Sequence, residues 1–337
     1  MALSFTDFMR VQVFARIPQP TESFSSKTVV VVGANTGIGK ESVKHLVRLG
    51  SSKIILGCRD TSKGESAKAE IQSLFPTSKS ILEVWEVDLI SYPSVQEFAR
   101  RVSSQLERLD TLILNAGLNL TVFQVCNGTE MSMGVNVLST FLLAMLLVPK
   151  LRETARRFGV SPNLTFTTSA MYTVAKFPER QDDVFDWLGK RENVDPHSQY
   201  ALTKLFHIVV IRKLATLIDP QTDVKTPTTP PIIVNSLDPC LCKTDLFRSV
   251  QGPLKIVLAI FKLFARTAEE GARLVVIAAS ADRESHGGYM RVGALKEYAP
   301  NIMSPSGVEN SEYVWDQVAK KLEGIQPGLI AAATETS

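Results

Sequence analysis

The sequence has little of several features that would assign a function at once. Only four of its 337 residues are cysteine (Cys58, Cys126, Cys240 and Cys242), and their irregular spacing gives no disulfide framework. No histidine or further cysteine lies near Cys240-x-Cys242 to complete a zinc site, so we expect no metal. We interpret the four thiols as reduced, which indicates a reducing, intracellular compartment.

The sequence also has a low net charge, and its first residues contain no long apolar run. The formal net charge of +3 is too small to indicate nucleic-acid binding, and there is no basic arm. Residues 1–20 mix Asp7, Arg10 and Arg16 into their apolar positions, so they resemble neither a signal peptide nor a membrane span. The final residues, TETS, match no address signal. We therefore expect a cytoplasmic protein with no transmembrane segment and no nucleic-acid partner.

What the sequence does contain is a regular alternation of apolar runs and helical patterns. The run TVVVVG is β-branched and continuous, as in a strand buried on both faces. Apolar runs occupy 28–33, 53–57, 81–87, 111–115, 163–168, 231–237 and 287–292. Helical patterns occupy 40–50, 61–74, 94–108, 129–156, 197–217 and 267–280, and the last opens with a capping box, Thr267 with Glu270. This alternation predicts an α/β fold, a doubly wound Rossmann-type parallel sheet of about seven strands between two helical layers.

The same pattern predicts a single large domain. Apolar residues make up 45% of the chain, which is ample for a core, and there is no repeat or linker that would divide it. We expect one domain over 27–325, preceded by an extension at 1–26 and followed by a tail at 326–337.

The stretch GANTGIG (33–39) follows the first predicted strand. Its glycines, Gly33, Gly37 and Gly39, let the backbone turn tightly and let a pyrophosphate approach without a Cβ in the way. The helix that follows offers free N–H groups at its N-terminus. Sharp turns also need glycine, so this cluster alone does not decide between the two interpretations.

The second predicted strand ends in CRD (58–60). A guanidinium at Arg59 can pair bidentately with a ribose 2′-phosphate, which favours NADP(H) over NAD(H). The alternative is a solvated surface arginine. Asp60 is better placed to cap the next helix.

A proton-transfer pair lies further along, in YALTK (200–204). Tyr200 and Lys204 are four residues apart on a predicted helix, so their Cβ atoms lie roughly 6 Å apart. A neighbouring ammonium favours phenolate and should lower the tyrosine pKa. Ser169 follows the fifth predicted strand, where its hydroxyl could orient a substrate oxygen toward Tyr200 or cap a turn.

The order of these motifs resembles that of the short-chain dehydrogenase/reductase family over residues 27–295. The family's turn, TGxxxGIG, matches Gly33 to Gly39, with Val32 where threonine is commoner. GANTGIGKE, CRD and the 31-residue Ser169–Tyr200 separation resemble the retinol-dehydrogenase-like and fungal branches. The extra length, 172–199, is expected to border the substrate mouth.

The resemblance implies a site, residue by residue. It assigns catalysis to Ser169, Tyr200, Lys204 and Asn136, with Asn136 holding a water that relays protons from Lys204. It assigns cofactor binding to Gly33, Asn35, Thr36, Gly37, Ile38, Gly39, Arg59, Asp88, Leu89, Asn115, Ala116, Gly117, Tyr200, Lys204, Pro239 and Thr244. In this assignment Asp88 and Leu89 hold the adenine and Thr244 holds the nicotinamide carboxamide. Cys240 stands where the family has glycine after Pro239, which leaves open the local backbone angles and how the nicotinamide face is held.

The resemblance also implies a function: NADP(H)-dependent interconversion of a ketone or aldehyde and an alcohol on a lipophilic small molecule, as in a ketoreductase of secondary metabolism. Alternatives are a dehydratase, epimerase or cyclase on the same fold, or a catalytically silent NADP-binding regulator. Residues 252–266 are expected to form a substrate lid, or instead to lie on a membrane surface as a peripheral contact. Pairing of two copies through the long helices as a homodimer is a further expectation.

Overall fold

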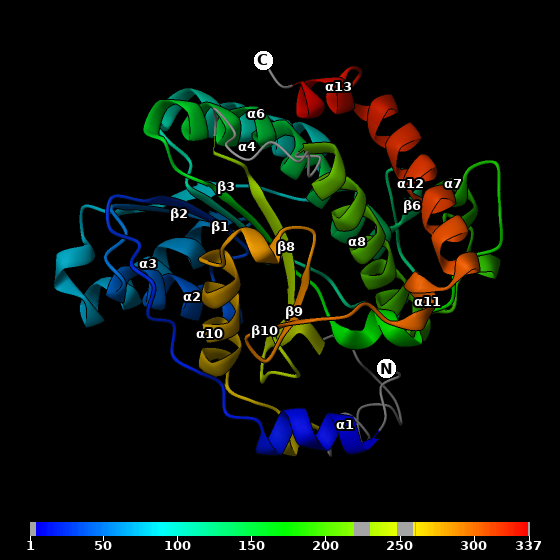
Figure 1. The fold of residues 1–337 in the computed structure, drawn as a ribbon, viewed down its shortest axis with the longest axis horizontal. Coiled ribbons are helices and arrows are strands. Elements are labelled where there is room, and N and C mark those ends of the chain that lie inside the picture. Colours follow the sequence, from blue (N-terminus) through cyan, green and yellow to red (C-terminus); the bar gives the residue numbers. More distant parts are fainter. Residues whose placement is uncertain (1–4, 219–229, 248–258, 260, 336–337) are drawn as a thin grey trace.

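The computed structural model describes residues 5–218, 230–247, 259 and 261–335. Its centre is an eight-stranded sheet in the order β10-β9-β8-β7-β4-β1-β2-β3 (Figure 1). The strands are β1 (Thr28–Val32), β2 (Lys53–Cys58), β3 (Leu82–Glu86), β4 (Thr111–Leu114), β7 (Asn163–Thr167), β8 (Ile233–Asp238), β9 (Tyr289–Arg291) and β10 (Ala294–Lys296). Neighbouring strands are parallel except β9 and β10. The predicted doubly wound α/β fold is confirmed, with β10 as an antiparallel addition.

Helices cover both faces of this sheet (Figure 1). One layer contains α2 (Gly37–Arg48), α3 (Thr61–Leu74) and α10 (Ala268–Ala279), and the other contains α4 (Tyr92–Gln105), α6 (Thr140–Phe158) and α8 (Pro196–Ile218). Successive residues of β1 alternate between the two cores: Val29 and Val31 face the first layer, whereas Val30 and Val32 face the second. This explains why the strand is apolar throughout.

The helix predicted over 129–156 is interrupted near its start. A short pairing of β5 (Val125–Cys126) with β6 (Thr129–Glu130) precedes α5 (Met131–Met133), and a π-helical segment, η3 (Gly134–Ser139), joins α5 to α6. Together Met131–Phe158 is long and apolar enough to span a membrane, but 89% of its most apolar window is buried inside the fold. It is therefore a core helix by its surroundings.

The expected extension and tail both contain helices. Near the N-terminus, α1 (Phe5–Met9) continues into a π-helical turn, η1 (Arg10–Phe14). Near the C-terminus come α11 (Pro300–Met303), α12 (Pro305–Ile325) and α13 (Leu329–Thr334). Here α13 packs on α6, where the guanidinium of Arg152 donates to Ala333 O at 3.0 Å. This contact occupies part of one of the long helices, and pairing of two copies through the long helices stays a prediction.

Short helical turns fill the connections. They are η2 (Pro76–Ser78), η4 (Ala170–Val174), α7 (Val184–Leu188), η5 (Arg191–Asn193), η6 (Asp245–Phe247) and η7 (Arg283–Ser285). The predicted capping box is confirmed at the start of α10, where Thr267 and Glu270 bond each other's backbone N–H groups. Of the expected lid at 252–266, residues 252–258 and 260 lie outside the described residues.

Candidate active site

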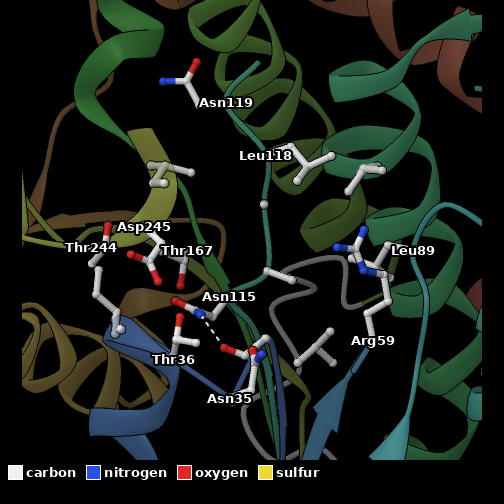
Figure 2. Close-up of a pocket in the computed structure, with 18 of the residues that line it drawn as sticks. Asn35, Thr36, Arg59, Leu89, Asn115, Leu118, Asn119, Thr167, Thr244 and Asp245 are labelled. Carbon is white, nitrogen blue, oxygen red and sulfur yellow. Dashed lines mark hydrogen bonds between the residues drawn. The ribbon is translucent and has the colours of Figure 1, made fainter. Parts of the chain in front are cut away.

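A cleft opens at the carboxyl ends of β1 and β4, where the strand order reverses and ligands bind in folds of this kind. Its volume is about 550 Å³. Nearly all the residues expected to bind a dinucleotide line it: Gly33, Asn35, Thr36, Gly37, Ile38, Arg59, Asp88, Leu89, Asn115, Ala116, Gly117, Tyr200, Lys204, Pro239 and Thr244. Figure 2 shows Arg59 and Leu89 on one side of this cleft and Thr244 on the other. Gly39, Ser169 and Asn136 lie outside its lining.

The glycine turn leaves room for backbone where a side chain would collide. Gly33 has a φ of +83°, and a Cβ on it would lie 2.8 Å from the Cα of Ala116. A Cβ on Gly39 would lie 2.0 Å from Gly33 O, so this third glycine serves the close packing of α2 on the turn. Thr36 precedes α2 and makes no side-chain cap bond, so the N-terminus of α2 offers its N–H groups to the cleft.

The end of β2 presents two cations. Arg59 is exposed and lines the cleft, as does Lys63, one turn into α3. Asp60 caps that helix, because its Oδ1 accepts from Lys63 N at 3.1 Å. The sequence analysis missed Lys63, although its position one turn after CRD could have suggested it.

Asp88 and Leu89 form the cleft wall at the end of β3. The Asp88 carboxylate also closes a local turn, accepting from Ile90 N at 3.0 Å. Across the cleft, the amide of Asn115 donates to Gly33 O at 3.2 Å, which ties β4 to the glycine turn. Both residues therefore have a structural partner and a cleft-facing position.

Tyr200 and Lys204 project from α8 into the same cleft. The Lys204 Nζ lies 5.5 Å from the centre of the Tyr200 ring and donates to Thr167 O at 3.1 Å. The Ser169 side chain lies close enough to lower the pKa of the Tyr200 hydroxyl, and its Oγ accepts from Met171 N at 3.2 Å. Ser169 therefore caps the η4 turn, and its expected role toward a substrate oxygen stays a prediction.

Burial dominates the titration of this pair. It raises the pKa of Tyr200, the carboxylate of Asp238 raises it further, and only the bond to Ser169 opposes them. Burial lowers the pKa of Lys204 to about 7, against the attraction of Asp238. The expected lowering of the tyrosine pKa by Lys204 is therefore not a property of the protein by itself. With a pKa of about 7, Lys204 is about half protonated at neutral pH, so it supports a phenolate less than a fully charged ammonium would.

Asn136 lies in the π-helical segment η3, a type of distortion that often marks functional sites. Its amide is paired with both backbone groups of Leu118, at 2.7 Å and 2.8 Å, and donates to Thr203 Oγ1 at 3.2 Å. The backbone carbonyl oxygen of Asn136 accepts from His207 Nε2 at 2.6 Å. Burial lowers the pKa of His207 well below its usual value, so this ring is neutral. The sequence analysis missed His207, which follows Lys204 by three residues on α8.

The loop after β8 carries Pro239 and Thr244 to the cleft. Cys240 adopts a φ of +66°, the left-handed conformation that glycine prefers. Its N–H donates to Asp238 Oδ1 at 3.1 Å. The cysteine thus adopts a conformation that glycine favours, and Asp238 stabilises it.

The segment 172–199 contributes no lining residue to this cleft, contrary to expectation. Its polar groups are paired with α12 instead: Gln181 N donates to the Tyr313 hydroxyl at 2.8 Å, and Val184 N donates to Gln317 Oε1 at 2.9 Å. The apolar residues that line the cleft include Leu118, Leu120 and Leu246.

Comparisons with known proteins agree with this geometry. A family model for short chain dehydrogenases matches residues 27–162. Short chain dehydrogenase/reductase dmxR8 of Cryptosporiopsis sp. is 36% identical over 328 residues, covering 96% of this chain and 98% of that protein. Short chain dehydrogenase FGM9 of Gibberella zeae is 34% identical over 332 residues, covering 98% of this chain and 95% of that protein.

Solved structures share the fold at lower identity. A short chain dehydrogenase from Shigella flexneri complexed with NADP has a TM-score of 0.58 and 20% identity, covering 82% of this chain and 100% of that one. The Pseudomonas aeruginosa RhlG/NADP active-site complex has a TM-score of 0.59 and 19% identity, covering 81% of this chain and 97% of that one.

Proposed function

Because the chain belongs to the short-chain dehydrogenase/reductase family, we propose that it is an NADP(H)-dependent oxidoreductase that interconverts a carbonyl and an alcohol on a lipophilic small molecule. The observation that carries the proposal is the meeting of Tyr200 and Lys204 with the glycine turn in one cleft. A dinucleotide fits the residues present, because Gly33 provides the open backbone and α2 the free N–H groups that a pyrophosphate needs.

The nicotinamide supplies or accepts the hydride when it is bound. In reduction, the Tyr200 hydroxyl donates its proton to the carbonyl oxygen, and its raised pKa keeps that proton in place at neutral pH. Ser169, whose side chain lies close to Tyr200, would hold the same oxygen. In oxidation, Tyr200 must give up its proton first, which needs a positive charge beside it from Lys204 or from the oxidised ring. Asn136 would hold the relay that returns protons to solvent.

Two cations support NADP(H) as the preferred cofactor. Arg59 and Lys63 line the end of the cleft where a ribose 2′-phosphate would lie. Asp60 lines it too, but its Oδ1 caps α3 and its Oδ2 lies 3.7 Å from Lys63 Nζ, so Arg59 carries most of this argument. A carboxylate that accepts from a 2′-hydroxyl would favour NAD(H) instead. The two structural neighbours described above contain NADP, as their names state.

The apolar lining by Leu118, Leu120 and Leu246 supports a lipophilic substrate. The resemblance to the fungal branch supports a ketoreductase of secondary metabolism, acting in the cytoplasm. A homodimer paired through the long helices is part of the proposal, and α13 packs on one of those helices, α6.

The test is a screen of NADPH and NADH consumption over ketones and aldehydes graded in size and polarity. We expect turnover with NADPH on bulky apolar carbonyls and little with polar ones. Binding of NADPH with no oxidation across the panel would favour the silent regulator, and a product of unchanged redox level would favour a dehydratase, epimerase or cyclase.

Arg59→Ala sharpens the same test. Loss of a charge-assisted pair should raise the KM for NADPH about tenfold and leave the KM for NADH unchanged. Lys68→Ala is the control, since Lys68 is a cation on α3, the helix that follows Arg59, and it is paired with Glu65 and lies outside the cleft. Equal changes for both cofactors would contradict the assignment of Arg59.

A further inference from the structure

The segment formed by α1 and η1 lies before the part of the chain that carries the nucleotide-binding pattern, and Figure 1 shows α1 below α10 and β10. It contacts the loop after β8, which carries Pro239 and Thr244 into the cleft. Two separate links join the segment to that loop, one on each side of Cys240.

The first link is the side-chain amide of Gln12, a polar group that is only 6% exposed. Its Nε2 donates to Leu241 O and its Oε1 accepts from Leu241 N, both at 3.0 Å. The amide thus pairs with both backbone groups of Leu241, as a neighbouring strand would. Nε2 also reaches Phe264 O at 3.3 Å.

Backbone pairing reinforces this contact from the other side. Arg266 N donates to Leu241 O and Lys243 N donates to Arg266 O, each at 2.9 Å. The Arg266 guanidinium in turn donates to the carbonyls of Val11 and Ala15. The residue after Cys240 is therefore held by the segment both directly and through Arg266.

The second link is a row of alternating charges. Asp7 pairs with Arg291 at 2.6 Å, and Arg291 Nε pairs with Asp238 at 3.2 Å. The other oxygen of Asp238 accepts from Cys240 N at 3.1 Å. The side chains of Asp7, Arg291 and Asp238 are 10%, 16% and 6% exposed, so solvent screens these pairs only weakly.

Both links hold the backbone at Cys240 in a conformation that is unfavourable for cysteine. The left-handed conformation costs an L-residue roughly 1–2 kcal/mol, and Cys240 adopts it between two cleft-lining residues. Without outside support, this loop would relax toward a conformation that displaces Pro239 and Thr244.

We propose that the N-terminal segment 5–16 is part of the catalytic unit, in which Gln12 and Asp7 are positioning residues that hold the 239–244 loop in its cofactor-binding shape. The proposal rests on the proposed function, because it takes the ligand of this cleft to be NADP(H). Gln12 and Asp7 touch neither cofactor nor substrate in it.

The experiment compares NADPH dissociation constants, measured by fluorescence titration, for the wild type and Gln12→Met. The methionine keeps the length of the side chain and removes the bonds to Leu241. We expect NADPH to bind about five- to tenfold more weakly, the loss of one or two hydrogen bonds. Turnover at saturating NADPH should fall by less than the affinity.

Thr154→Val is the matched control. It also removes a buried side-chain acceptor from a backbone N–H, that of Leu109 at 2.8 Å, but on α6 and outside the cleft. Thermal unfolding of both variants without cofactor separates lost stability from lost positioning. Thr154→Val should keep NADPH affinity within twofold of the wild type.

An unchanged NADPH affinity in Gln12→Met, or an equal weakening in Thr154→Val, would overturn the inference. If Gln12→Met does not fold, Asp7→Asn replaces it, with an expected weakening of about two- to threefold, and an unchanged affinity there overturns it equally. A wild type that binds no NADPH would instead refute the proposed function, and this inference with it.

Discussion

The glycine turn after β1 and the loop after β8 both need backbone with a positive φ, and they obtain it in different ways. Each leads from a buried parallel strand into the cleft, and each contains residues with a positive φ. In the turn these residues are Gly33 and Gly37, and glycine adopts a positive φ without a steric penalty because it has no Cβ. The loop uses Cys240, held by Asp238 and by contacts to Gln12, 229 residues away from Leu241. Backbone geometry can thus be fixed by residue type or imposed by the rest of the fold.

The largest effect is expected where the turn is tightest. In Gly39→Ala the new Cβ would lie 2.0 Å from Gly33 O, a backbone atom that cannot move aside alone. We expect a loss of about 3 kcal/mol in the free energy of unfolding, measured by urea denaturation. Gly324→Ala is the control: nothing lies within 4 Å of that position on α12, so alanine should stabilise the helix by up to about 1 kcal/mol. If Gly39→Ala left the free energy of unfolding unchanged, the idea that the turn depends on glycine at this position would be wrong.

A smaller effect concerns Lys204, which lies between the two regions. Burial lowers its pKa from 10.5 to about 7. Between pH 7 and 10.5 the unfolded chain therefore binds more protons than the folded one, so the stability of the fold rises with pH across this window. Below pH 7 the protonated Lys204 is buried, and the whole free-energy cost of burying its charge is present.

Lys204→Met removes that cost. At pH 6 the cofactor-free variant should melt about 2–4 °C above the wild type, and the difference should shrink toward pH 10. Scanning calorimetry at both pH values measures it. A variant that melts lower at pH 6, or a difference that does not change with pH, would contradict the assigned burial of the ammonium.

The smallest effect is expected at Cys240. Cys240→Gly relieves the left-handed strain but gives the unfolded chain more freedom, so the two terms, each about 1 kcal/mol, nearly cancel. We expect the unfolding free energy and the NADPH affinity to stay close to wild-type values in chemical denaturation and titration. Cys240→Val should lose more stability, because a branched Cβ tolerates this conformation least. Equal stability for glycine and valine would show that no strain is present at this position.

The difference between local residue type and distant contacts also explains which parts of the fold could be predicted from the sequence. The strands β1, β2, β4 and β7 were predicted within a residue or so, because each is a continuous apolar run. The strand β10 was missed, since it has three exposed residues and follows β9 after a short turn. No local sequence pattern indicated that α12 would form hydrogen bonds with the 172–199 segment.

The candidate site divides in the same way. Residues placed by strand ends, such as Asp88 and Asn115, could be predicted because parallel strands bring their carboxyl ends together. His207, Arg291 and Gln12 could not, because their partners lie far along the chain. The raised tyrosine pKa also escaped prediction, since helical spacing gives the distance to Lys204 but not the degree of burial.

The central claim is that Tyr200 transfers the proton in this cleft, and its most direct test is the turnover of Tyr200→Phe with NADPH and an accepted carbonyl. We predict a loss of about 10²- to 10⁴-fold in kcat, with NADPH affinity and thermal stability close to the wild type. A folded Tyr200→Phe enzyme that binds NADPH and turns over at the wild-type rate would contradict the mechanism.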